Sequence, residues 1–117
     1  MTVKLLTSGG LGDAAMAFAK AKALNLSDSD IHIYHARIRE DNLDKPILDF
    51  YKSQGIESTV IRLKKNDDRH TGDILDEWVL NNVKDYNHYL GTHWSSDNGS
   101  DISSWEIEPF PEVKYDD

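Results

Sequence analysis

The chain has 117 residues, a length that suits one domain. Asp and Glu number 21 against 13 Lys and Arg, and the formal net charge of −8 argues against general binding of nucleic acids or anionic membranes. The absence of cysteine excludes disulfides, thiolate catalysis and Cys-ligated zinc. Polar residues arrive by Thr7, too early for a signal peptide, and no apolar run approaches the ~20 residues that span a bilayer, so we expect a cytoplasmic protein without a membrane span.

The N-terminus predicts a strand, a glycine turn and a helix. Residues 3–7 are short and apolar enough for a buried strand, and residues 14–24 are rich in alanine and lack Gly and Pro. Between them, Gly9, Gly10 and Gly12 permit a tight turn and let a ligand approach the backbone closely. The helix start adds free N–H groups and the positive end of the helix dipole. These features are typical of the first βα unit of a nucleotide-binding sheet.

The predicted first helix, at residues 11–24, has one apolar face. Most of that face is alanine, whose small side chain lets a helix pack closely on a sheet. The face consists of Ala14, Ala17, Phe18, Ala21 and Leu24, with Lys20 and Lys22 at its flanks.

Further strand-like and helix-like segments follow in alternation. They predict a strand at 31–36, a strand at 58–63, a helix at 72–84 and a strand at 86–91. A helix between the first two of these strands is expected to start with Asp44 as its N-cap and to end at Gly55, where a C-terminal cap belongs.

This alternation predicts an α/β fold with a parallel sheet and right-handed crossovers. We expect a Rossmann-like three-layer sandwich whose sheet of about four strands has the order 3-2-1-4. The domain should occupy residues 1–94, and residues 95–117 should form a loop, an additional short edge strand around Trp105 and Ile107, and a tail.

Ligands of parallel sheets bind beyond the carboxyl ends of the strands. The chain places four loops there, at residues 8–13, 37–42, 64–71 and 91–101. The basic residues of these loops are either solvated surface charges or a clamp for phosphate. The candidate ligand-binding residues are Ser8, Gly9, Gly10, Gly12, Arg37, Arg39, Lys64, Lys65 and Arg69.

One interpretation of the glycine turn is a dinucleotide site. Gly10-x-Gly12-x-x-Ala15 fits the fingerprint G-x-G-x-x-G/A. No acidic residue ends the second predicted strand, where NAD would need one for its ribose hydroxyls. Arg37 and Arg39 follow that strand instead and could accept a 2′-phosphate, so NADP stays open as a cofactor.

The glycine turn also resembles the opening of a known enzyme family. The stretch reads Thr7-Ser8-Gly9-Gly10-Leu11-Gly12-Asp13-Ala14-Ala15-Met16-Ala17. It is similar to the start of the GT-B glycosyltransferases related to lipopolysaccharide heptosyltransferases, and Gly12 and Asp13 stand at the Gly-Asp of their motif. The order of the predicted elements to about Gly91 is similar as well. The resemblance implies an N-terminal Rossmann-like domain that binds the acceptor, with Asp13 as the catalytic base that deprotonates the acceptor hydroxyl.

The resemblance further implies a second Rossmann-like domain that binds a nucleotide sugar as co-substrate, for which 117 residues leave no room. We therefore expect a glycosyltransferase-like acceptor domain that is inactive alone and holds no cofactor of its own. Its ligand would be a sugar or a phosphate-bearing small molecule, and its partner a second Rossmann-like domain or another chain. The non-enzymatic alternative is a nucleotide- or sugar-binding module.

Asp13 has two interpretations. A carboxylate in a first helical turn stabilises the helix dipole by about 0.3–1 kcal/mol, so Asp13 could be a plain cap rather than a base. In either role it counts against a dinucleotide, because a pyrophosphate needs unshielded N–H donors at that place.

No metal site is expected, because no spacing of the five histidines is typical of zinc. An uncovered sheet edge, together with the apolar pair Trp105 and Ile107, is compatible with self-association into a homo-oligomer.

Overall fold

The computed structural model describes residues 2–24, 26, 30–38, 42–65, 68–92 and 100–102. Within this part of the chain, strands and helices alternate as the sequence predicts. In chain order they are β1 (Thr2–Ser8), α1 (Leu11–Ala23), β2 (Asp30–Arg37), α2 (Asp44–Ser53), β3 (Glu57–Arg62), α3 (Thr71–Asn82), the 3₁₀ turn η1 (Val83–Asp85) and β4 (His88–Tyr89).

The described strands form one parallel sheet in the order β3-β2-β1-β4, which confirms the predicted fold class and strand order. β1 lies at the centre, where it pairs with β2 along its whole length and with β4 at Leu5 and Leu6. β2 pairs with β3 in the same direction. All strands therefore end at one edge, and the turns that follow them gather there.

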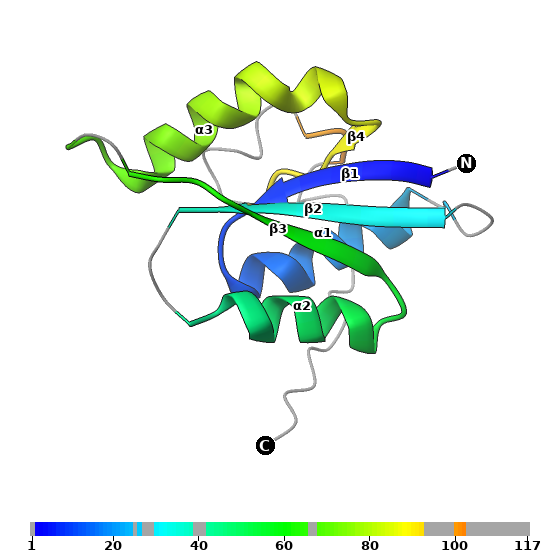
Figure 1. Cartoon of the computed structure of the whole chain (residues 1–117). Coiled ribbons are helices and arrows are strands. Elements are labelled where there is room, and N and C mark those ends of the chain that lie inside the picture. Colours follow the sequence, from blue (N-terminus) through cyan, green and yellow to red (C-terminus); the bar gives the residue numbers. More distant parts are fainter. Residues whose placement is uncertain are drawn as a thin grey trace.

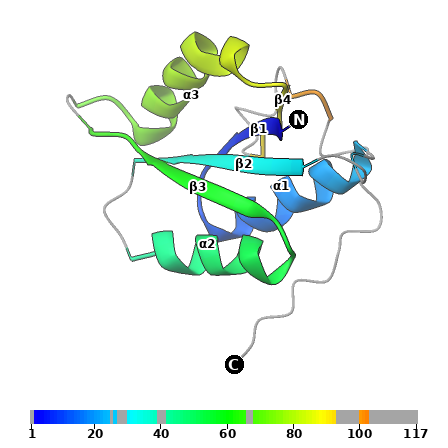
Figure 2. The same cartoon turned by 45° about the vertical axis from the view of Figure 1, so that its right-hand side comes forward.

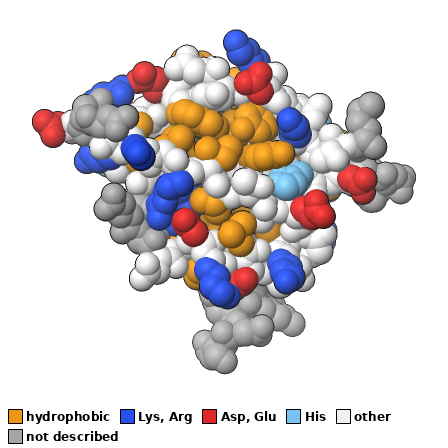
Figure 3. Space-filling view, in the orientation of Figure 1, with side chains coloured by type: hydrophobic (Ala, Val, Ile, Leu, Met, Phe, Trp, Pro, Cys, Tyr) orange, Lys and Arg blue, Asp and Glu red, His pale blue; other side chains and the backbone are white. Residues whose placement is uncertain are grey.

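The helices cover both faces of the sheet. α1 and α2 lie on one face and α3 on the other, which gives the three layers of a Rossmann-like sandwich (Figures 1 and 2). Successive residues of β1 serve the two faces, since Leu5 packs with α1 and α2 whereas Leu6 packs with Val79 of α3. On the α3 side, hydrophobic side chains gather between α3 and the sheet (Figure 3).

The α1 face packs closely because its inward positions carry alanine. Ala14, Ala17 and Ala21 are at most 2% exposed and join one core cluster with Leu5 and Ile33. Their spacing of three and four residues puts them on one side of the helix. Small side chains at these positions bring the helix axis close to the strands.

Lys20 departs from the prediction, because it is fully buried rather than placed at a flank of α1. Its ammonium group donates to the carbonyl oxygen of Gly91, and Ser100 Oγ lies 3.3 Å from Nζ. These acceptors come from the chain beyond β4, 71 and 80 residues away in sequence. A buried charge needs such partners.

The ends of α2 confirm one predicted cap and correct the other. Gly55 has φ of 76°, and Ile56 N donates to Tyr51 O at 3.0 Å, a C-terminal cap that favours glycine. The N-cap, however, is Leu43. Asp44 is the first residue of the helix, where its carboxylate pairs with Arg37 instead of capping the backbone.

β4 is shorter than the predicted strand at 86–91, since only His88 and Tyr89 pair with β1. Residues 100–102 lie beside it: Asp101 N donates to Tyr89 O at 2.9 Å, and the Asp101 carboxylate accepts from Tyr89 N at 3.2 Å. The edge strand expected around Trp105 and Ile107 falls outside the described residues. None of the helices in the described part of the chain is long and apolar enough to span a membrane.

Candidate functional site

The glycine turn at the end of β1 is built around one glycine and one carboxylate. Gly9 has φ of +119°, a conformation that side chains other than glycine's rarely adopt. Asp13 Oδ2 accepts a hydrogen bond from Gly10 N at 2.7 Å, across the first turn of α1. A Cβ atom on Gly9 would lie 2.2 Å from that same oxygen. Gly9 is therefore required both by its backbone angle and by the closeness of Asp13.

The other two glycines of the turn are not required by the fold. A Cβ atom on Gly12 would meet nothing within 4 Å, and the nearest atom to one on Gly10 would be Asp13 Oδ2 at 3.9 Å. Gly12 is exposed and Gly10 partly so. These positions leave open surface beside Asp13, over which a ligand can approach the backbone.

The carbonyl of Gly9 holds the turn to the second strand. It accepts from His35 Nε2 at 3.0 Å and from Arg37 Nε at 3.2 Å, while Gly9 N donates to Ala36 O at 3.2 Å. Because a carbonyl oxygen only accepts, the ring proton of His35 is on Nε2. Nδ1 is then an acceptor, and the hydroxyl of Tyr51 donates to it at 2.7 Å from α2.

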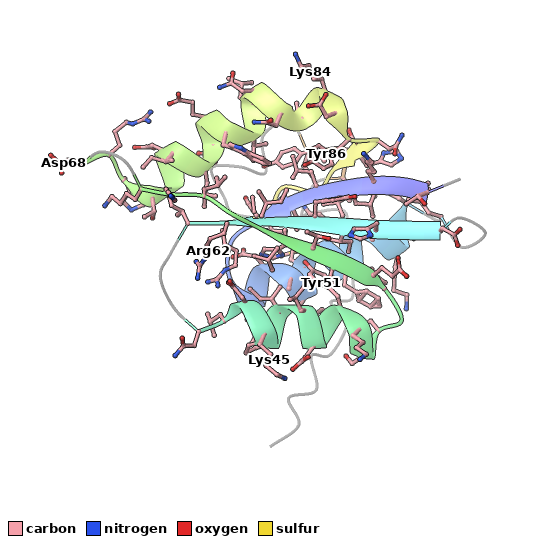
Figure 4. The ribbon with its side chains drawn as sticks, in the orientation of Figure 1. Lys45, Tyr51, Arg62, Asp68, Lys84 and Tyr86 are labelled. Atoms are coloured by element: carbon pink, nitrogen blue, oxygen red, sulfur yellow. The ribbon has the colours of Figure 1, made fainter. Side chains whose placement is uncertain are left out.

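His35 and Tyr51 form a buried polar pair beneath the turn; Tyr51 reaches from α2 toward the sheet (Figure 4). Burial lowers the pKa of His35 to about 4, against the opposing effects of its bond to Gly9 and of the Asp13 carboxylate. Burial raises the pKa of the Tyr51 hydroxyl well above its ordinary value. Both side chains are thus neutral near pH 7, as the hydrogen-bond pattern requires.

Arg37 joins the turns that follow the first three strands. Its guanidinium is 2% exposed and bonds to Asp44 Oδ1 at 2.6 Å, in addition to Gly9. Arg62 Nη2 lies 3.4 Å from the second oxygen of Asp44, and Leu63 N donates to Arg37 O at 2.7 Å. Arg37 therefore acts on the protein's own backbone and on Asp44, while Arg39, the other basic candidate of this loop, falls outside the described residues.

The basic loop after β3 faces a different neighbourhood. Lys64 and Lys65 are exposed, and Arg69 pairs with Glu77 of α3. Lys64 and Arg69 line a pocket of about 280 Å³ between this loop and α3, together with Trp78. The candidate residues thus separate into the glycine turn with Asp13, which leads into α1, and the basic loop, which faces α3.

His35, Tyr51 and Asp44 support the site but were not among the candidates from sequence. For His35 a signal was present, since alternation along β2 puts it on the same side as the buried Ile33. For Tyr51 a signal was also present, since it follows the buried Ile47 by four residues on one face of the helix. Asp44 carries no such signal, because its ion pairs with arginines of β2 and β3 depend on tertiary packing.

Comparison with known proteins adds no relative: no known family, no curated protein and no solved structure matches this chain. Within the described ranges, no three or more His, Cys, Asp or Glu residues gather where they could hold a metal ion.

Proposed function

We propose that this domain binds a hydroxyl-bearing acceptor at the glycine turn, as the acceptor-side half of a GT-B-type glycosyltransferase, with Asp13 as the base. The position of Asp13 is the observation that carries the proposal. One carboxylate oxygen is fixed by Gly10 N at 2.7 Å, and the other makes no hydrogen bond to any described residue. A carboxylate fixed by one oxygen and open at the other can accept a proton from a bound hydroxyl.

In the proposed reaction the acceptor hydroxyl donates to the open oxygen of Asp13. The hydroxyl oxygen of the acceptor attacks the anomeric carbon of a nucleotide sugar as the hydroxyl proton passes to Asp13. The new glycosidic bond forms while the bond to the diphosphate breaks, and the nucleoside diphosphate leaves with the electron pair. The nucleotide sugar would be held by a second Rossmann-like domain, in the same protein or in a partner chain.

The NADP alternative has less support from the contacts of the turn. A pyrophosphate would use the N–H groups at the start of α1, but the Asp13 carboxylate already occupies that of Gly10. Arg37, one of the two arginines suggested for the 2′-phosphate, is buried against Asp44. A binding module without catalysis uses the same surface, and only turnover separates it from the transferase.

Two substitutions separate the capping role of Asp13 from its catalytic role. Asp13→Asn keeps an acceptor for Gly10 N, so its unfolding free energy should stay within about 0.5 kcal/mol of wild type, whereas Asp13→Ala should lose about 1 kcal/mol. Both should lose transfer at least about a hundredfold once a donor domain is supplied. Urea unfolding and an assay of sugar transfer measure the two effects. An Asp13→Asn protein with full turnover would reduce Asp13 to a cap.

This domain alone should transfer no sugar, because the sheet of its described residues is proposed to bind the acceptor and not the nucleotide sugar. Incubation of the purified protein with nucleotide sugars and candidate acceptors, followed by detection of released nucleoside diphosphate, tests this. Release that Asp13→Asn abolishes would contradict the need for a second domain.

The acceptor site itself can be tested with Gly12→Val. A Cβ atom at Gly12 meets nothing within 4 Å, so the variant should fold yet crowd the surface beside Asp13 and weaken binding of hydroxyl-rich ligands about tenfold or more. Chemical-shift changes in titrations with free sugars and with NADPH locate the ligand. Shifts that cluster near Gly55, at the opposite edge of the sheet, or tight binding of NADPH would overturn the assignment.

A further inference from the structure

The pocket on the α3 side is separate from the glycine turn. Leu63 and Lys64 form its wall where the chain leaves β3, and Trp78 and Glu77 of α3 face them. α3 covers one face of the sheet, and α1, into which the glycine turn leads, covers the other (Figures 1 and 2). The pocket therefore needs no part of the Asp13 site.

The pocket offers an aromatic ring together with unused hydrogen-bonding groups. The indole N–H of Trp78 makes no hydrogen bond to a described residue, and no buried side-chain nitrogen or oxygen of the described residues lacks a partner. The indole N–H is therefore accessible. Asn82 Nδ2 donates to Trp78 O at 2.7 Å, which orients that amide and leaves its oxygen open. A ligand with both an apolar ring face and polar substituents suits such a wall.

The charges at the pocket favour an anion. Arg69 pairs with Glu77, but both side chains are about half exposed, at 48% and 55%. Such a surface pair is weak, so Glu77 can also accept from a ligand. Lys64 makes no ion pair with any residue that the structure describes. Lys64 can therefore pair with an anion, and Glu77 adds an acceptor for ligand hydroxyls.

We propose that this pocket binds a phosphorylated monosaccharide. The sugar ring would lie against Trp78, its hydroxyls would donate to Glu77 and to the oxygen of Asn82, and its phosphate would pair with Lys64. The volume of about 280 Å³ is just below the range of roughly 300–1,000 Å³ of drug-sized sites, which suits a single ring. The Glu77 carboxylate only accepts, so it suits the hydroxyl donors of a sugar.

Titrations with glucose-6-phosphate, inorganic phosphate and AMP, followed by two-dimensional NMR, test the proposal. The chain has three tryptophans, and the indole peak that disappears in Trp78→Phe belongs to Trp78. Glucose-6-phosphate should shift that peak with a dissociation constant in the millimolar range or below. Lys64→Ala should weaken binding about tenfold, since a charged hydrogen bond is lost. Lys65→Ala, the adjacent exposed lysine outside the pocket lining, should change it less than about twofold.

Several outcomes would overturn the proposal. Absence of a shift at the Trp78 indole with glucose-6-phosphate removes the site, and equal effects of Lys64→Ala and Lys65→Ala reduce it to general charge attraction. Inorganic phosphate that binds as tightly, or AMP that binds more tightly, makes the ligand class wrong. Asp13→Asn should leave this binding unchanged. If it abolishes binding, the ligand occupies the glycine turn, so failure here is distinguishable from failure of the proposed transferase function.

Discussion

Gly9→Ala should destabilise the protein by about 2–4 kcal/mol. The backbone angle of +119° is strained for any residue with a Cβ atom, and that atom would lie 2.2 Å from Asp13 Oδ2. To avoid the clash, the Asp13 carboxylate must move away from Gly10 N, which breaks the hydrogen bond between them at the N-terminus of α1. Urea unfolding of the variant and of the wild type measures the loss.

Gly12→Ala is the matched control, since it is the same substitution three residues later. A Cβ atom there meets nothing within 4 Å and lies within α1, so the variant should be unchanged or more stable by up to about 1 kcal/mol. The double variant Gly9→Ala, Asp13→Ala removes the clash with the carboxylate but keeps the backbone strain and a Cβ–Cβ approach of 2.9 Å, and should show less than the sum of the separate losses. If Gly9→Ala and Gly12→Ala unfold alike, the turn does not have the geometry described.

Acidification should destabilise the fold between about pH 6.5 and pH 4 through His35. In the unfolded chain the pKa of this histidine is about 6.5, whereas burial lowers it to about 4 in the fold. Above pH 6.5 both states hold neutral His35 and its full contribution to stability is present. As the pH falls, the unfolded state binds the proton first, and about 3 kcal/mol is lost by the time the pH passes below the folded pKa.

Burial has the largest effect on the pKa of His35; of the charged groups nearby, Asp13 and Asp44 raise that pKa, whereas Arg37 lowers it. His35→Gln removes the titration and should flatten the stability profile over this range, at a cost of about 1–2 kcal/mol near pH 7 for the poorer fit between Gly9 and Tyr51. His32→Gln changes a partly exposed histidine of the same strand and should keep the slope. Unfolding curves at a series of pH values test this prediction. If the loss of stability on acidification persists in His35→Gln, other groups cause it.

Local patterns in the sequence were sufficient to predict the layers of this protein. Apolar strand-like segments alternate with helix-like ones, and the right-handed crossover then leaves few topologies, so the parallel order 3-2-1-4 was predictable. The spacing of the α1 alanines was sufficient to predict that they face the sheet, and Gly55 was sufficient to predict the end of α2. These features depend on residues within one or two turns of each other.

The presence of the glycine turn was predictable, but the separate roles of its three glycines were not. Three glycines looked equivalent, and the structure gives only Gly9 a conformation and a neighbour that exclude other residues. The reason is that the constraint comes from the path of the backbone from β1 into α1, with Asp13 folded back on Gly10. The spacing of glycines does not encode that path.

What the sequence determined by itself is therefore the set of elements, their order in the sheet and the loop edge where Asp13 lies. Tertiary structure alone decided the partners of the polar side chains: Lys20 is buried against the chain beyond β4, and Arg37 turns inward to Gly9 and Asp44. Trp78 likewise lines a pocket with the loop after β3. A charged or aromatic side chain has several satisfactory environments, and which one it finds depends on acceptors that long-range packing brings within about 3 Å.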